Sequence, residues 1–259
     1  MTLSAITRPG VAVEIGGMPI VLCNANPSFR AMLESRYAGF VKPPAEGQFE
    51  FDIHLHEPAG VPAPDEDVQV SSHDGRWRMK RGDFEAEWDS RAGRGRVQQS
   101  PNPYAIDSVL RIVHTLLLAP QGGFLVHAAS AIRQGRAFLF AGVSGAGKTT
   151  ISRLAPADAV LLTDEISYVR PEGDHYAAWG TPFAGELATS GENRSAPLQT
   201  LFILEQGREN RIVDIASTEA VRLLLRNILF FAHDTDLVRR VLQSACEFVE
   251  RVPVKRLSF

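Results

Sequence analysis

One short segment of this chain combines glycines, a lysine and a threonine at a spacing that suits phosphate binding. Residues 142–149 read Gly-Val-Ser-Gly-Ala-Gly-Lys-Thr, a complete G-x-x-x-x-G-K-[ST] motif. In this motif the backbone N–H groups turn toward phosphate oxygens, the lysine reaches the β- and γ-phosphates, and the hydroxyl ligates Mg²⁺. We therefore predict ATP and Mg²⁺ as cofactors, although the motif does not separate ATP from GTP. The predicted nucleotide-binding residues are Gly142, Ser144, Gly145, Ala146, Gly147, Lys148, Thr149 and Thr150.

The segments on either side of the motif agree with this interpretation. Residues 137–141 are a short apolar run, typical of a buried strand, and they follow a turn-like segment at 133–136. Residues 148–154 contain neither glycine nor proline, which favours a short helix that starts at the loop. The N-terminus of such a helix would face the phosphates.

Two acids and a histidine are the candidates for chemistry beside the motif. Asp164 and Glu165 follow the apolar strand 160–162, where one acid could bind the metal and the other act as a base. The alternative is that Asp164 begins a turn and Glu165 is solvated. His127 lies on the apolar strand 124–132, where a histidine is often only a satisfied core residue.

These three segments together resemble the catalytic domain of the HPr kinase/phosphorylase family. The matching residues are His127, the motif at 142–149, and the acidic pair at 164–165. The resemblance implies that Lys148 is catalytic, that Asp164 is the base toward a serine hydroxyl with His127 assisting it, and that Thr149 and Glu165 ligate Mg²⁺. It also implies a fold shared with phosphoenolpyruvate carboxykinase and assembly into a homo-oligomer.

A second glycine-containing segment follows the acidic pair. Residues 180–186 read Gly-Thr-Pro-Phe-Ala-Gly-Glu, which is either an active-site loop in which Glu186 meets substrate or metal, or an ordinary turn. Arg194 could neutralise charge during phosphoryl transfer, but a solvated loop arginine is the simpler interpretation.

Composition narrows the class of protein. The chain has 259 residues, a net charge of −3 and two cysteines, so it has no basic field for nucleic acid and no disulfide framework. No signal peptide and no apolar stretch long enough for a membrane span is evident, which predicts a cytoplasmic protein with neither nucleic-acid nor membrane partners. The run 76–81 mixes arginine with tryptophan, but acids follow it directly and favour a charged face of a β-meander.

The chain divides near residues 100–103. Residues 1–100 predict a small β-rich accessory domain, with a strand at 49–56 and an antiparallel meander after it. Residues 101–259 predict a kinase domain of the HPr-kinase type, with helices at 104–118, 217–231 and 236–249 and further strands at 201–204 and 212–215. The predicted fold class is therefore α/β, a P-loop domain with a mixed sheet behind a β-rich N-terminal domain.

The predicted function is transfer of the γ-phosphoryl group of ATP to a serine hydroxyl on a protein or peptide partner. Two alternatives stay open at this stage. One is a nucleotide-binding regulatory protein with weak or no transfer activity, and the other is a small-molecule kinase.

Overall fold

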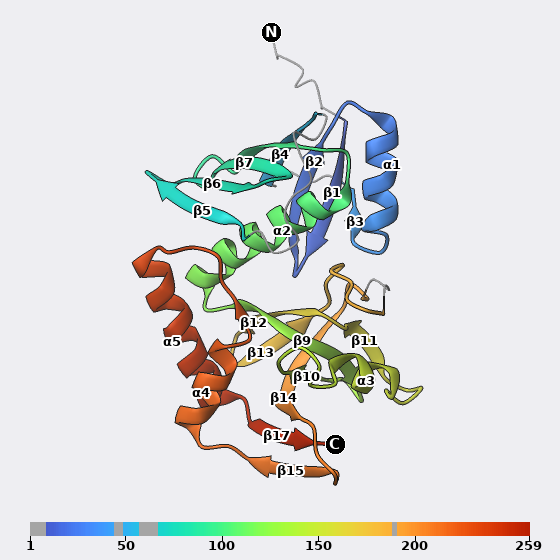
Figure 1. Cartoon of the computed structure of the whole chain (residues 1–259), viewed down its shortest axis with the longest axis vertical. Coiled ribbons are helices and arrows are strands. Elements are labelled where there is room, and N and C mark those ends of the chain that lie inside the picture. Colours follow the sequence, from blue (N-terminus) through green and yellow to red (C-terminus); the bar gives the residue numbers. More distant parts are fainter. Residues whose placement is uncertain (1–8, 44–48, 57–66, 188–190) are drawn as a thin grey trace. The chain divides into compact units, whose positions relative to one another are not determined.

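The computed structural model describes residues 9–43, 49–56, 67–187 and 191–259 (Figure 1). The chain divides into two compact units, Met1–Val109 and Leu110–Phe259. The sequence-based domain boundary at residues 100 and 101 stays a prediction. Helix α2 (Pro103–Leu118) runs through the division between the units.

The N-terminal unit is built on an eight-stranded sheet with the order β3-β1-β2-β4-β8-β7-β6-β5. Strands β2, β4 and β8 are parallel neighbours, whereas β5 to β8 form the antiparallel meander that the sequence predicts. Its elements are β1 (Gly10–Ile15), β2 (Met18–Cys23), α1 (Pro27–Arg36), β3 (Val41–Lys42), β4 (Phe49–Leu55), β5 (Gln69–His73), β6 (Arg76–Arg81), β7 (Phe84–Asp89) and β8 (Arg94–Gln99).

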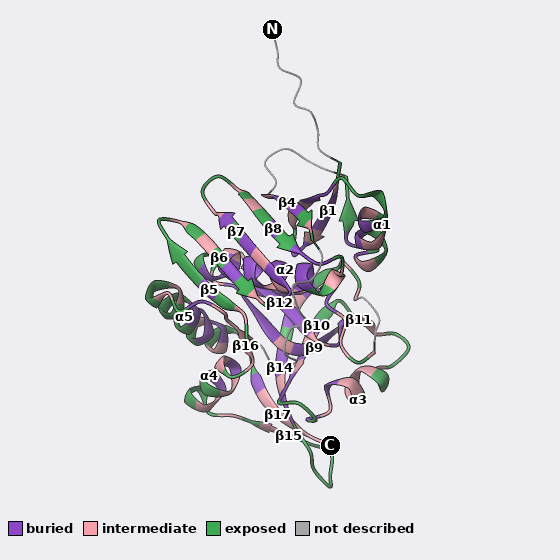
Figure 2. Ribbon diagram, turned by 45° about the horizontal axis from the view of Figure 1, so that its top comes forward, coloured by how far each residue is buried: buried purple, intermediate pink, exposed green. Residues whose placement is uncertain are grey.

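Alternation along strands of the meander gives this part of the sheet one apolar and one charged face. In β7, Phe84, Ala86 and Trp88 are buried, while the glutamates between them are more exposed (Figure 2). Successive side chains of a strand point to opposite faces, so this pattern buries one face of the sheet. Helix α1, which the sequence did not reveal, begins where the Asn26 side chain accepts hydrogen bonds from two backbone N–H groups.

The C-terminal unit contains most of the remaining strands and helices. Its elements after α2 are η1 (Ala119–Gln121), β9 (Phe124–Arg133), β10 (Arg136–Ala141), α3 (Lys148–Arg153), β11 (Val160–Thr163), β12 (Ile166–Glu172), β13 (His175–Trp179), β14 (Ser195–Glu205), β15 (Arg211–Asp214), α4 (Ser217–Leu225), β16 (Ile228–Leu229), α5 (Thr235–Arg251) and β17 (Val254–Ser258). The predicted strands at 124–132, 137–141 and 160–162 are confirmed as β9, β10 and β11.

Five strands of this unit close into a barrel. β9 pairs with β10 in a hairpin and also with β12, β12 pairs with β13, and β13 pairs with β14. A parallel pairing between β10 and β14 completes the ring. Beyond the ring, β17 and β15 extend the sheet from β14.

Helices pack on the barrel from two sides. Helices α4 and α5 lie on one side and the short α3 on the other, as both views show (Figures 1 and 2). Phe248 of α5 is fully buried and packs edge-on against Phe124 and Tyr176 of the barrel strands. Helix α4 ends at Leu225, short of the predicted residue 231, because β16 then pairs with β9.

The predicted α/β P-loop fold is wrong. The described residues are 42% strand and 26% helix, and the C-terminal unit is a five-stranded barrel with an extended sheet. An α/β fold requires helical crossovers between parallel strands, but here β9–β10 and β12–β13 are antiparallel hairpins. Within the described ranges, no helix is both long and apolar enough to cross a membrane.

Candidate active site

Three connections of the C-terminal unit and helix α2 supply the walls of one polar pocket. The connections are the glycine-rich loop between β10 and α3, the turn between β11 and β12, and the segment after β13. The pocket has a volume of about 380 Å³, which lies in the range of small-molecule sites. It is lined by Arg111, His127, Ser144, Gly145, Gly147, Lys148, Thr149, Thr150, Glu165, Ala184, Gly185 and Glu186.

The glycine-rich loop has a backbone that only glycine adopts readily. Gly147 has a φ of +110° and precedes α3, and the ring of Phe259 lies against it. A Cβ atom at Gly147 would come within 2.6 Å of that ring. Gln206 donates a hydrogen bond to the Gly145 carbonyl at 2.9 Å, so residues distant in sequence hold the loop in shape.

Lys148 is buried beneath this loop. Its Nζ donates to the carbonyls of Gly142 at 2.9 Å and Val143 at 3.4 Å. Burial lowers the pKa of the ammonium group, while Glu165 and Glu186 oppose the shift. Among the described residues, the hydrogen bonds of Lys148 Nζ go to neutral carbonyls. A buried cation with such partners is stabilised by an additional anion, so this lysine fits a phosphate group.

Thr149 and Glu186 bring two side-chain oxygen atoms together at the pocket. The Thr149 hydroxyl donates to Oε2 of Glu186 at 3.0 Å. Mg²⁺ prefers oxygen ligands and keeps several waters, so a hydroxyl and one carboxylate at this spacing fit it. The sequence predicts Thr149 and Glu165 as the metal ligands, and this stays a prediction. The carboxylate that accepts the Thr149 hydrogen bond belongs to Glu186.

His127 and Glu165 form the second pair. Nε2 of His127 lies 3.1 Å from Oε1 of Glu165, and both side chains are about one-third exposed. The pKa of the Glu165 carboxyl is lowered, chiefly by its hydrogen bond with His127 and further by the charges of His127, Lys148 and Arg111. Strand register explains the contact, because Ile166 of β12 is paired directly with His127 of β9.

Asp164 is not among the residues that line the pocket. It is 2% exposed, and its two carboxylate oxygens accept backbone N–H groups from Gly185 and Leu187, each at 2.9 Å. It therefore anchors the segment that carries Glu186. The prediction that Asp164 is a catalytic base stays a prediction, and each of its oxygens already accepts one backbone hydrogen bond.

The other sequence candidates are placed as follows. Gly142 and Ala146 are buried residues of the loop itself, and the Gly142 carbonyl accepts a hydrogen bond from Lys148. Arg194 is exposed, pairs with Glu192 and does not line the pocket. Sequence reasoning missed Arg111, which comes from the apolar helix α2 and carries no motif of its own.

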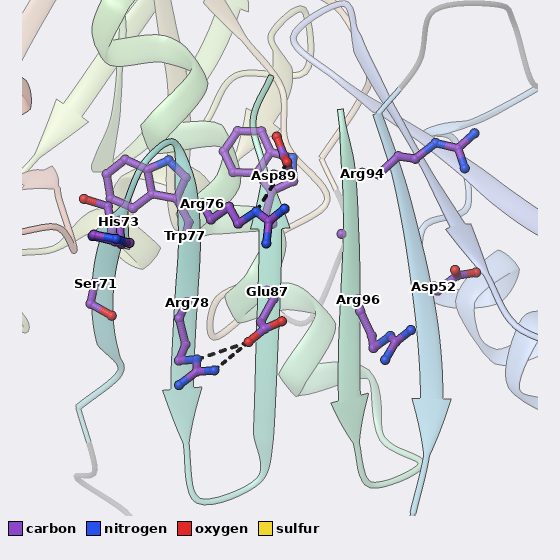
Figure 3. Close-up of a pocket in the computed structure, with 13 residues that line it drawn as sticks. Asp52, Ser71, His73, Arg76, Trp77, Arg78, Glu87, Asp89, Arg94 and Arg96 are labelled. Atoms are coloured by element: carbon purple, nitrogen blue, oxygen red, sulfur yellow. Dashed lines mark hydrogen bonds and ion pairs between the residues drawn. The ribbon is translucent and has the colours of Figure 1, made fainter. Parts of the chain in front are cut away.

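A larger hollow, of about 630 Å³, lies on the charged face of the N-terminal sheet (Figure 3). Here basic residues of β6 face acids of β7: Arg76 lies 3.6 Å from Asp89 and Arg78 lies 2.7 Å from Glu87. Opposite charges directly across neighbouring strands attract each other. This pairing supports the interpretation of the run 76–81 as a charged meander face, and we place the candidate active site elsewhere.

The fold and the site together define a two-unit protein with a phosphate-binding motif in its C-terminal unit. The C-terminal unit is a β-barrel that carries a G-x-x-x-x-G-K-T loop beside a histidine–glutamate pair. A family model matches residues 102–259, and the chain belongs to the family that it describes, SynChlorMet cassette protein ScmC. The resemblance to HPr kinase/phosphorylase is thereby corrected, since the family matched is a different one. A search of curated proteins finds no match.

Proposed function

We propose that this protein is an ATP- and Mg²⁺-dependent phosphotransferase that moves the γ-phosphoryl group to a serine hydroxyl of a protein or peptide. The observation that carries the proposal is the joining of three groups in one pocket. These are the buried Lys148, the Thr149–Glu186 oxygen pair, and the His127–Glu165 pair. Phosphoryl transfer needs the same three elements, namely a phosphate cradle, a metal position and a group that orients the nucleophile.

Each residue has a role that follows from its contacts. Lys148 Nζ, which donates to loop carbonyls, would bind phosphate oxygens of a bound nucleotide. Thr149 and Glu186 are the residues that would hold Mg²⁺, and the metal would supply charge neutralisation for the phosphates. Glu165, held by His127, accepts a hydrogen bond from the acceptor hydroxyl and orients its oxygen. Asp164 keeps Glu186 in place through its backbone hydrogen bonds. We place the reaction in the cytoplasm, where ATP is made and the two free cysteines stay reduced.

One observation favours a second candidate, a nucleotide-binding regulatory protein with weak transfer. The pKa of Glu165 is lowered, chiefly by the His127 hydrogen bond, and a carboxylate with a lowered pKa is a weaker proton acceptor. In a loose transition state the hydroxyl proton leaves late, so orientation by Glu165 is still sufficient for transfer. The two candidates therefore differ in whether an acceptor becomes labelled.

The test uses γ-labelled ATP, Mg²⁺ and a peptide library with serine acceptors. We expect acid-stable phosphoserine with the parent protein, and loss of label with Lys148→Ala and Glu165→Gln. Arg194→Ala is the matched control, because that arginine is exposed outside the pocket. Nucleotide binding without transfer to any acceptor would favour the regulatory protein, and label in a low-mass product would favour a small-molecule kinase. Absence of nucleotide binding would refute all three hypotheses.

A further inference from the structure

Arg111 is a cationic residue of the candidate pocket that belongs to no sequence motif. It lies in α2 between Leu110 and Ile112, which are both fully buried. Its side chain lines the same pocket as Lys148. Among the described residues that line this pocket, Arg111 is the one arginine. The helix therefore delivers a guanidinium group to a site whose other strong cation is the lysine of the glycine-rich loop.

A fully buried aromatic ring supports the guanidinium group. The Arg111 Cζ atom lies 4.9 Å from the centroid of the Phe183 ring, which has no exposed surface. A cation over an aromatic face is attracted to the ring, and a guanidinium group carries forked N–H donors whose geometry suits phosphate oxygens. A lysine at this position would lack the forked donors.

Phe183 also belongs to the segment that the site depends on. It directly precedes Ala184, Gly185 and Glu186 of the pocket wall. In this segment the backbone N–H of Gly185 donates a hydrogen bond to Asp164. The charge of Arg111 is felt inside the pocket, since it contributes to the lowered pKa of Glu165 after the larger effect of His127. Arg111 thus shares its surroundings with the group that we propose to orient the acceptor.

We infer that Arg111 is a catalytic residue that contacts the oxygens of the γ-phosphoryl group during transfer. This inference rests on the proposed phosphotransfer function. The bond from the γ-phosphorus to the bridging oxygen breaks, the bond to the serine oxygen forms, ADP leaves, and the hydroxyl proton passes to Glu165 or to water. The guanidinium neutralises charge on the transferred group and takes no proton.

The test compares Arg111→Ala and Arg111→Lys with Arg194→Ala in the full chain. We expect both Arg111 variants to lower kcat by at least about 100-fold, since an arginine that serves a phosphoryl transition state contributes about 10³-fold or more. Their affinity for ADP should stay within about threefold of the parent, because ADP has no γ-phosphoryl group. Free methylguanidinium should restore part of the activity of Arg111→Ala, and Arg194→Ala should match the parent.

Other results separate the alternatives. A kcat within threefold of the parent in Arg111→Ala would overturn the inference and leave the proposed function standing. Loss of ADP affinity in parallel with kcat, a fall in melting temperature in both variants, or no rescue by methylguanidinium would show that Arg111 only supports Phe183. A parent protein with no turnover of ATP would contradict the proposed function itself, and the inference with it.

Discussion

A buried histidine in the C-terminal unit predicts a specific loss of stability in mild acid. His114 has no exposed surface, and within the described part of the chain neither ring nitrogen has a hydrogen-bond partner. Its ring packs edge-on to Tyr168, with 5.7 Å between the ring centroids. Burial lowers the pKa of His114 from 6.5 to about 3, because the imidazolium ion would be desolvated without compensation.

The size of the effect follows from proton linkage. Between pH 6.5 and about 3 the unfolded chain binds a proton at His114 and the folded chain does not, so stability falls as the pH falls. The slope approaches about 1.4 kcal/mol per pH unit, and the loss between pH 7.5 and pH 5 amounts to about 2 kcal/mol. His114→Phe keeps a ring of similar size and removes this titration.

The assay is urea denaturation of the parent and His114→Phe at pH 7.5 and pH 5, followed by circular dichroism. The advantage of the variant should grow by about 2 kcal/mol at the lower pH, and other titrating groups cancel in this double difference. His233→Asn is the control for removal of an exposed histidine. A double difference below about 0.5 kcal/mol for His114→Phe would refute the reasoning.

Three further substitutions test the loops of the site. Gly185→Ala would bring a Cβ within 2.7 Å of Glu165 Oε2 and 2.9 Å of Asp164 Oδ2, so steady-state kinetics should show at least a tenfold loss of activity at a nearly unchanged melting temperature. Asp164→Asn replaces one acceptor with a donor that faces a backbone N–H group, and urea denaturation should show a loss of about 1–3 kcal/mol. Gly147→Ala places Ala at a φ of +110° against the Phe259 ring, which should abolish nucleotide binding in calorimetry. The double variant with Phe259→Ala should recover only the part of the binding loss that comes from the clash with the ring. Full activity of Gly185→Ala, parental stability of Asp164→Asn or parental nucleotide affinity of Gly147→Ala would contradict the loop geometry described above.

Local sequence patterns predict many individual elements and several of the residues that line the pocket. The glycine-rich motif, the histidine on β9 and the acidic pair after β11 are visible in the sequence, because each is defined by a few neighbouring residues. The resemblance drawn from the same residues led to the wrong family and the wrong fold class. Short phosphate-loop segments recur on different scaffolds, so they carry information about chemistry more than about architecture.

Tertiary structure decided what local pattern could not. Closure of the barrel depends on the pairing of β10 with β14, two strands that are not neighbours along the chain. The two neighbouring acids have different partners in the folded chain. Backbone N–H groups of Gly185 and Leu187 donate hydrogen bonds to Asp164, whereas Glu165 pairs with His127. These contacts are set by strand register across the whole unit, so the residues next to Asp164 and Glu165 in the sequence do not predict them.

The sequence by itself determined that this chain carries a loop shaped for phosphate, since glycine, lysine and threonine at that spacing specify local backbone and charge. Only the tertiary structure decided which side chains that loop meets. Glu186 reaches Thr149, and Arg111 reaches the pocket from a helix that precedes the motif by two strands. The physical reason is that backbone conformation depends on neighbours in sequence, whereas an electrostatic site depends on neighbours in space.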